Sequence, residues 1–276
     1  MSPVTVQHLF IYPVKSLCGV EVDSIEFTEF GPKDDRCYML IDANQRFVTQ
    51  RSHPVLSQFR LVAQENGWLV KFGDHQSPVI THQKCSDFIF QTKVWNSAIQ
   101  VREKCRHISD WFSEQLDELV RLVEFDDLET RFSQIADHQS PLSFADAYPL
   151  LICNSESLRL LSQRLNVHLA MQRFRPNVVI SMEENTEFLV SSFRMESGEL
   201  LVGPPCVRCN IPAIDPETAV YQRDLHKQLK AELLRDGQVV FGVNASPLHL
   251  KTLTVGDSLS PVMRPSPDIS PKSFSG

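Results

Sequence analysis

The sequence predicts a mostly β protein of the α+β class, and three observations lead to this expectation. Short apolar runs alternate with turn residues through most of the first half of the chain. Asn66-Gly67 separates two of these runs, and this dipeptide favours a tight hairpin because both residues tolerate positive φ. Apolar residues at helical spacing occur in only a few segments. Strands spaced this regularly are typical of a barrel or a sandwich.

The first half is expected to contain short strands and one helix. The helix is predicted at about 108–119, where apolar residues recur every three or four positions, and Ser109 or Asp110 would cap its start. A turn is expected at 43–45. The expected strands cover residues 9–12, 20–27, 37–42, 46–50, 61–64, 68–72 and 121–125.

The second half is expected to hold two helices among further strands. Asn154 or Ser155 would cap the first helix, which carries one apolar stripe, and the second helix is predicted at about 222–235. The expected extended segments are residues 173–181, 198–215 (strand, turn and strand), 238–246 and 250–259.

A polar stretch at 126–140 is the candidate junction between two domains. The predicted division is therefore 1–125 for the first domain and 126–260 for the second. Residues 261–276 are rich in proline and serine and lack apolar periodicity, so a flexible tail is expected there.

Composition excludes some classes of function. The 276 residues include 42% hydrophobic residues, enough for a sizeable core, and carry a formal charge of −7. An acidic chain without basic clusters is not expected to bind nucleic acid. No apolar run approaches the roughly 20 residues that span a bilayer, and the N-terminus has no charged region before its short apolar stretch. A cytoplasmic protein without membrane contact is therefore expected.

Cys206 and Cys209 are the only closely spaced pair among seven cysteines, which are otherwise expected to be reduced, buried thiols. A structural zinc site needs four ligands, and no second pair accompanies this one. A thioredoxin-like pair would begin a helix, which Pro212 opposes. Two packed thiols remain an alternative. Arg208 favours a thiolate beside it, the form that binds soft metals.

Several cations are predicted to form an anion-binding pocket. In an extended chain Arg173, Arg175 and Asn177 point to one face, and Pro176 favours an extended Arg175. Lys15-Ser16 and Arg36 also stand where a strand meets a loop. Each of these groups alone is more often a solvated surface charge. Together with Arg208 they suit a phosphate-bearing ligand.

Ordered motifs along the chain resemble those of MOSC-domain proteins, in particular the amidoxime-reducing component proteins and their bacterial relatives. The resemblance covers about residues 4–260. The motifs are YPVKS at 12–16, DR at 35–36, FADAYP at 144–149, FRPN at 174–177, PCVRCNIPAIDPET at 205–218 and VGD at 255–257. The resemblance implies an N-terminal MOSC-associated β-barrel region packed with a MOSC β-barrel domain that carries a few helices.

The resemblance also implies a pterin-based molybdenum cofactor whose metal is bound by Cys209. The implied cofactor-binding residues are Lys15, Ser16, Arg36, Arg175, Asn177 and Arg208. Asp146 is the implied residue beside the metal, and Cys206 has no implied ligand role. Ala147-Tyr148 departs from the family, whose mitochondrial members tend to carry small hydroxyl residues there.

The expected activity is molybdenum-dependent reduction of N-hydroxylated compounds: hydroxylamines, amidoximes or N-hydroxylated bases. The C-x₄-C-x₂-C spacing of a plant-type iron–sulfur domain is absent, so electrons are expected from a separate ferredoxin or flavoprotein. Two alternatives remain open. The first is a sulfur or cofactor carrier of the sulfurase type without reductase activity, and the second is a non-catalytic barrel that binds another phosphate.

Overall fold

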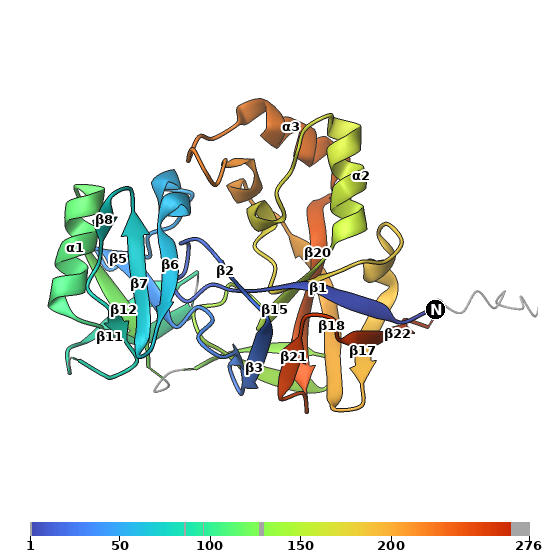
Figure 1. Ribbon diagram of the computed structural model, residues 1–276, viewed down its shortest axis with the longest axis horizontal. Coiled ribbons are helices and arrows are strands. Elements are labelled where there is room, and N and C mark those ends of the chain that lie inside the picture. The colour runs from blue at the N-terminus through green and yellow to red at the C-terminus, as the bar shows by residue number, and fades with distance from the viewer. Residues whose placement is uncertain (1, 86, 96, 127–129, 266–276) are drawn as a thin grey trace, which may run out of the picture.

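The computed structural model describes residues 2–85, 87–95, 97–126 and 130–265. Figure 1 shows two adjoining parts, one built from N-terminal sheets with one helix and the other from a barrel with two helices. The expectation of a mostly β protein that carries a few helices is confirmed. Among the described helices, none is long and apolar enough to cross a membrane.

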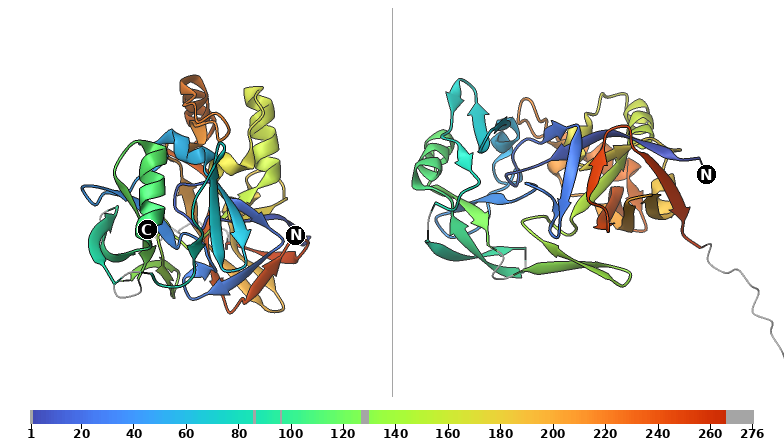
Figure 2. Two further views of the ribbon diagram at one scale, coloured as in Figure 1. Left: turned by 60° about the vertical axis from the view of Figure 1, so that its left-hand side comes forward. Right: turned by 60° about the horizontal axis from the view of Figure 1, so that its bottom comes forward.

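The barrel contains seven strands in the order β15-β16-β1-β22-β17-β18-β20, and pairing between β15 and β20 closes it. Its members are β1 (Val4–Ile11), β15 (Leu150–Asn154), β16 (Val178–Ile180), β17 (Val190–Met195), β18 (Gly198–Val207), β20 (Gln238–Leu248) and β22 (Ser258–Met263). β1 pairs with β16 and with β22, so the first strand of the chain lies in the barrel that the C-terminal half builds (Figure 1; Figure 2).

Helices close one end of this barrel (Figure 1). α2 (Ser155–Leu165) follows β15, and the chain returns through η2 (Met171–Phe174) to β16, which runs parallel to β15. Asn154 caps α2, because its side chain accepts a hydrogen bond from the backbone N–H of Glu156. α3 (Arg223–Glu232) follows η4 (Ile211–Ala213) and leads through β19 (Leu234–Arg235) into β20.

The N-terminal part contains two larger sheets and α1 (Arg106–Leu116). One sheet has the order β10-β11-β12-β5 and the other the order β6-β7-β8, with β9 paired to β7. Their strands are β5 (Tyr38–Asp42), β6 (Arg60–Gln64), β7 (Gly67–Phe72), β8 (His75–Gln76), β9 (Ile80–Thr81), β10 (Ile89–Val94), β11 (Ser97–Glu103) and β12 (Val120–Phe125). The shorter elements are β2 (Val20–Val22), β3 (Ser24–Thr28), β4 (Gly31–Pro32), η1 (Pro54–Gln58), β13 (Arg131–Ile135), β14 (His138–Leu142), η3 (Thr186–Leu189) and β21 (Thr252–Thr254).

One hydrophobic core extends through both parts. It contains barrel residues such as Leu9 and Val243 together with Phe59 and Phe112 of the N-terminal part, all fully buried. Phe59 stacks on Phe72 with ring centroids 4.2 Å apart, and α1 packs against this pair through Phe112. The shared core fixes the N-terminal loops against the end of the barrel.

The hairpin predicted at Asn66-Gly67 is confirmed as β6 and β7. Gly67 has φ +151°, and a Cβ there would lie 2.0 Å from the carbonyl oxygen of Ile80, so the close approach of β9 requires glycine. Asn154 is the N-cap of α2, and it was one of the two residues predicted for this position.

Several predictions about elements are wrong. Residues 46–50 form only isolated bridges, because the turn at Gln45 (φ 61°) brings Phe47 and Arg46 to different neighbours. The N-cap of α1 is Cys105, and the predicted cap Ser109 instead donates its hydroxyl to Glu103. In the described stretch from Cys209 to Asp215 the predicted second strand is absent, since the chain turns into η4.

The C-terminal segment also differs from the prediction. Residues 261–263 belong to β22 and pair with β17, and the Arg264 side chain donates to the backbone of Val202 and Gly203. These residues are therefore part of the barrel. The rest of the predicted tail, from 266 onward, lies outside the described residues.

Candidate active site

A cavity of about 600 Å³ lies where the N-terminal part meets the barrel end. Its lining includes all eight residues that the family resemblance implies for the site: Lys15, Ser16, Arg36, Asp146, Arg175, Asn177, Arg208 and Cys209. These residues are up to 194 positions apart in the chain (209 minus 15), so the fold assembles them.

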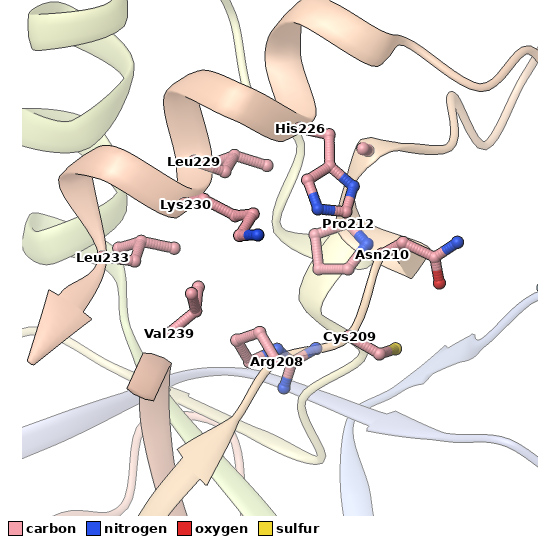
Figure 3. Close-up of a pocket in the computed structure, with 10 residues that line it drawn as sticks. Arg208, Cys209, Asn210, Pro212, His226, Leu229, Lys230, Leu233 and Val239 are labelled. Atoms are coloured by element: carbon pink, nitrogen blue, oxygen red, sulfur yellow. The ribbon is translucent and has the colours of Figure 1, made fainter. Parts of the chain in front are cut away.

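The cysteine segment leaves β18 at an irregular end of the strand. Pro204 and Pro205 lack backbone donors, and the register of β18 against β20 shifts on both sides of Pro205. Cys209 follows directly and is exposed as a free thiol. Figure 3 shows Cys209 and Arg208 at the edge of a second cavity of about 210 Å³, which lies beneath α3.

The Arg208 guanidinium contacts Cys206 and not Cys209. Its Nη1 donates to Cys206 Sγ at 3.1 Å and its Nη2 donates to the carbonyl oxygen of Phe174 at 2.8 Å. Residues two positions apart on a strand share one side, which explains the pairing. In the fold Arg208 therefore lies beside the Cys206 thiol, although Cys209 is its direct neighbour in the sequence.

All seven cysteines are free thiols, as expected, but they are not uniformly buried. Cys153 is buried, whereas Cys85 and Cys209 are exposed and the other four are half-buried. Of the two exposed thiols, Cys209 lines the larger cavity, together with the half-buried Cys206.

Two guanidinium groups of the cavity lining, those of Arg36 and Arg175, pack against one buried aromatic ring. The Arg36 and Arg175 guanidinium carbons lie 4.4 Å and 4.3 Å from the centroid of the Tyr12 ring. Tyr12 is 1% exposed, and its hydroxyl donates to the carbonyl oxygen of Pro176 at 3.0 Å. Cation–π attraction holds two like charges close together. Burial lowers the pKa of Arg175, which means that the cation lacks full compensation.

Asn177 positions the Arg36 side chain through hydrogen bonds. Its Oδ1 accepts from Arg36 Nη1 at 2.9 Å, and its Nδ2 donates to Asp35 Oδ1 at 3.1 Å. Asp35 also accepts a hydrogen bond from Arg36. Because Asn177 is 1% exposed and its amide is used on both sides, its main effect is to orient Arg36.

Lys15 and Asp146 form an ion pair at the other side of the cavity. Lys15 Nζ also donates to the carbonyl oxygen of Phe144 at 2.8 Å, and burial lowers the pKa of Lys15 against the opposing charge of Asp146. The Asp146 side chain is 66% exposed toward the cavity. Partial dehydration acts to raise its pKa, but Lys15 and Arg36 hold the pKa of Asp146 well below its usual range.

Ser16 lies next to Lys15 at a tight bend of the backbone. It adopts a positive φ of 73°, and its carbonyl oxygen accepts from Gln50 Nε2 at 2.7 Å. In the described part of the chain, its hydroxyl has no hydrogen-bond partner. The bend therefore leaves this hydroxyl available at the cavity wall.

The prediction that Arg173, Arg175 and Asn177 share an extended face is wrong. Arg173 lies in η2, and its Nη2 pairs with Asp215 at 2.8 Å, away from the larger cavity. Arg175 has φ 56° and ψ 47°, the left-handed conformation, in spite of Pro176. This backbone turn directs Arg175 toward Tyr12 and Leu17, where its Nη1 donates to the carbonyl oxygen of Leu17 at 2.7 Å.

Sequence reasoning missed Arg51 and Trp95 in the cavity lining and the buried Tyr12 that packs against two of the lining arginines. Tyr12 stands in the YPVKS motif and could have been noted there, whereas Arg51 and Trp95 carry no local signal. Trp95 Nε1 donates to Asp146 Oδ1 at 3.2 Å across 51 positions of sequence. Such contacts follow from the packing of the two parts.

Comparison with known families matches two models in chain order. Residues 3–118 match the MOSC N-terminal beta barrel domain and residues 139–260 match the MOSC domain. The gap between the matches, residues 119–138, contains β12 and β13.

Curated relatives agree with these matches. Mitochondrial amidoxime reducing component 2 from Homo sapiens is 30% identical over 279 residues, which cover 92% of this chain and 82% of that protein. The same protein from Macaca fascicularis matches equally. Molybdenum cofactor sulfurase from Danio rerio is 26% identical over 98% of this chain but only 34% of its own length. Among solved structures, the YUAD protein from Bacillus subtilis covers 93% of this chain and 94% of its own, with a TM-score of 0.43 and 12% identity.

Proposed function

The chain belongs to the MOSC-domain family and is a relative of the amidoxime-reducing components, and from this premise we propose that it is a molybdenum-cofactor-dependent reductase of N-hydroxylated compounds. The substrates would be hydroxylamines, amidoximes or N-hydroxylated bases. In the reaction the N–O bond breaks, and two electrons and two protons give the amine and water. A separate protein of the ferredoxin or flavoprotein type would supply the electrons.

The residues that line the larger cavity fit an anionic cofactor with a soft metal. Lys15, Arg36 and Arg175 bring three cations to the lining. Lys15 pairs with Asp146 and Arg36 with Asp35, whereas among the described residues Arg175 has no carboxylate in ion-pair contact. A phosphate suits such groups, since guanidinium forks bind it in a bidentate manner. The exposed thiol of Cys209 is a soft ligand. When bound, the molybdenum cofactor would supply the two-electron chemistry.

We assign roles to the predicted residues according to their contacts. Cys209 would hold the metal through its thiolate. Lys15, Ser16, Arg36 and Arg175 would bind the pterin and its phosphate. Asn177 and Arg208 would contribute indirectly. Asn177 orients Arg36, and Arg208 donates hydrogen bonds to Cys206 and to the Phe174 carbonyl oxygen.

Asp146 is assigned to the substrate side of the cavity. Because its pKa lies well below the usual range, the carboxyl stays ionised at neutral pH and accepts hydrogen bonds. This favours ordering a water molecule or the substrate N–H over donating a proton. The protons of the reaction would therefore reach the N-hydroxyl group through water.

The observation that carries the proposal is the exposed Cys209 thiol in a cavity lining that also holds the buried Lys15 and the half-buried Arg36 and Arg175. The test is reduction of hydroxylamine by the cofactor-loaded protein with a chemically reduced viologen as electron source. Cys209→Ser should reduce the rate to background. Cys85→Ser is the matched control, because Cys85 is also an exposed thiol but does not line the cavity. A fully active Cys209→Ser protein would overturn the assignment.

A sulfur or cofactor carrier remains the second candidate, and the similarity to molybdenum cofactor sulfurase favours it. A carrier would bear a persulfide on Cys209 and would not reduce N-hydroxylated compounds. Intact-mass measurement of the purified protein, before and after thiol reduction, distinguishes the two proposals.

A further inference from the structure

Trp95 is partly exposed at the cavity and is not packed in the core. Trp68 and Trp111 are 6% and 9% exposed, whereas Trp95 is 47% exposed and lines the larger cavity. It directly follows β10 at the hairpin that leads to β11, with φ 56°. A positive φ is uncommon for a bulky residue, and such conformations cluster at functional sites.

Three contacts hold the indole in place. Its Nε1 donates to Asp146 Oδ1 at 3.2 Å. The Arg51 guanidinium lies 4.4 Å from a ring centroid of Trp95, and Phe47 meets the indole edge-on at 5.8 Å. An exposed indole is thus fixed by a carboxylate from one segment of the chain and by a cation and an aromatic ring from another.

Trp95 lies next to the part of the cavity where the reaction is proposed to take place. Asp146 accepts hydrogen bonds from both Lys15 and Trp95, so the indole adjoins the carboxylate assigned to the substrate side. Arg51 also lines the cavity and places a planar cation beside the indole. An indole and a guanidinium together suit a flat, conjugated group, which stacks on aromatic faces and lies well beside planar cations.

We infer that Trp95 and Arg51 form a substrate subsite that selects planar, conjugated N-hydroxylated compounds, such as aryl amidoximes and N-hydroxylated bases, over hydroxylamine itself. This inference rests on the proposed reductase function of the same cavity. The conjugated ring of the substrate stacks on Trp95, while its N-hydroxyl group lies toward Asp146 and Cys209. Trp95 is therefore a specificity-determining residue.

The activity test compares two substrates in the cofactor-loaded protein. The ratio of kcat/KM for benzamidoxime to kcat/KM for hydroxylamine should fall about 5- to 140-fold in Trp95→Ala, the range for loss of one base–aromatic stack. Trp95→Phe keeps a ring and should keep most of the ratio. Phe132→Ala is the matched control, since Phe132 is 56% exposed but lies outside the cavity lining, and its ratio should not change.

A purely structural role for Trp95 predicts a different pattern. If the indole served only to hold Asp146 through its N–H group, Trp95→Phe would be as impaired as Trp95→Ala, and both substrates would be affected equally. Either result overturns the subsite while leaving the reductase function standing. Failure of the wild type to reduce any N-hydroxylated compound instead overturns the proposed function, and the subsite falls with it.

Fluorescence provides a readout independent of turnover. Because the other two tryptophans are buried, acrylamide should quench mainly Trp95. Benzamidine, the amidine that reduction of benzamidoxime releases, should protect this fluorescence from quenching in the cofactor-loaded wild type, and ammonium at the same concentration should not. Trp95→Phe should lack the protectable component. Equal protection by both probes, or none by benzamidine, contradicts the subsite.

Discussion

At the scale of single residues, buried side chains position the side chains that are expected to contact a ligand in the cavity. Tyr12 lies against both Arg36 and Arg175, and Asn177 holds Arg36 from the opposite side. The sequence motifs predicted which residues come together. Which of them bind a ligand and which only position a neighbour depends on burial. Asn177 is 1% exposed, and no residue pattern indicates that its amide is used up within the protein.

The Lys15–Asp146 pair leads to a prediction about pH. Replacing Lys15 by Met removes the cation that lowers the Asp146 pKa, so this pKa should rise toward the ordinary Asp value of about 3.9. Since the folded pKa of Asp146 is depressed in the wild type, its ionised form stabilises the fold above the unfolded pKa, and this contribution is lost as pH falls toward the folded pKa. Carboxyl ¹³C NMR titration of Asp146 in the cofactor-free protein measures the shift.

Lys33→Met is the control for this titration. Lys33 pairs with Glu26 at 2.8 Å on the surface and does not line the cavity, so its removal should leave the Asp146 titration unchanged. An identical Asp146 pKa in wild type and Lys15→Met would show that Lys15 does not control this carboxyl.

At the scale of elements, sequence patterns predicted those features that depend on local chemistry. The Asn66-Gly67 hairpin and the Asn154 cap follow from the conformations that these residues prefer. The segment at 173–177 was mispredicted, because tertiary packing forms η2 and turns Arg175 into the left-handed region. The strand expected after Cys209 is replaced by η4, where Pro212 starts a short helical turn.

Asn154 should be more important than an ordinary helix cap. It is fully buried, donates to the Glu183 carbonyl at 3.1 Å and to Glu187 at 3.0 Å, and accepts from the Met182 backbone at 3.2 Å. Asn154→Ala should lower the free energy of unfolding by about 2–4 kcal/mol, because the cap and several buried partners are lost together. Denaturant unfolding measures it. The neighbouring Ser155→Ala should change stability by no more than about 0.5 kcal/mol, and equal effects of the two would refute this role.

At the scale of the whole molecule, the cavity depends on how the two parts of the chain are joined. The family resemblance predicted two β-barrel regions, but apolar patterns alone did not indicate that β1 inserts between β16 and β22. Long-range pairing of this kind has no local signature, which explains why ordered motifs were more informative than periodicity. The domain division at 125 and 126 stays a prediction.

A fragment of residues 126–276 tests that division. Without β1 the barrel lacks one of its seven strands, and β16 and β22 each present an unpaired edge. The fragment alone should show no cooperative thermal unfolding by circular dichroism. A cooperative transition as stable as that of the full chain would show that residues 126–276 fold independently.

Cys209 is proposed to hold a molybdenum cofactor in the larger cavity, and metal and pterin content test this role most directly. Elemental analysis and pterin fluorescence should be measured on wild type, Cys209→Ser and Cys85→Ser, all produced in cells that synthesise the cofactor. We predict near-stoichiometric molybdenum and pterin in wild type and Cys85→Ser, and loss of the metal in Cys209→Ser. A wild-type protein without molybdenum and pterin, or a Cys209→Ser protein that retains both in full, would contradict the claim.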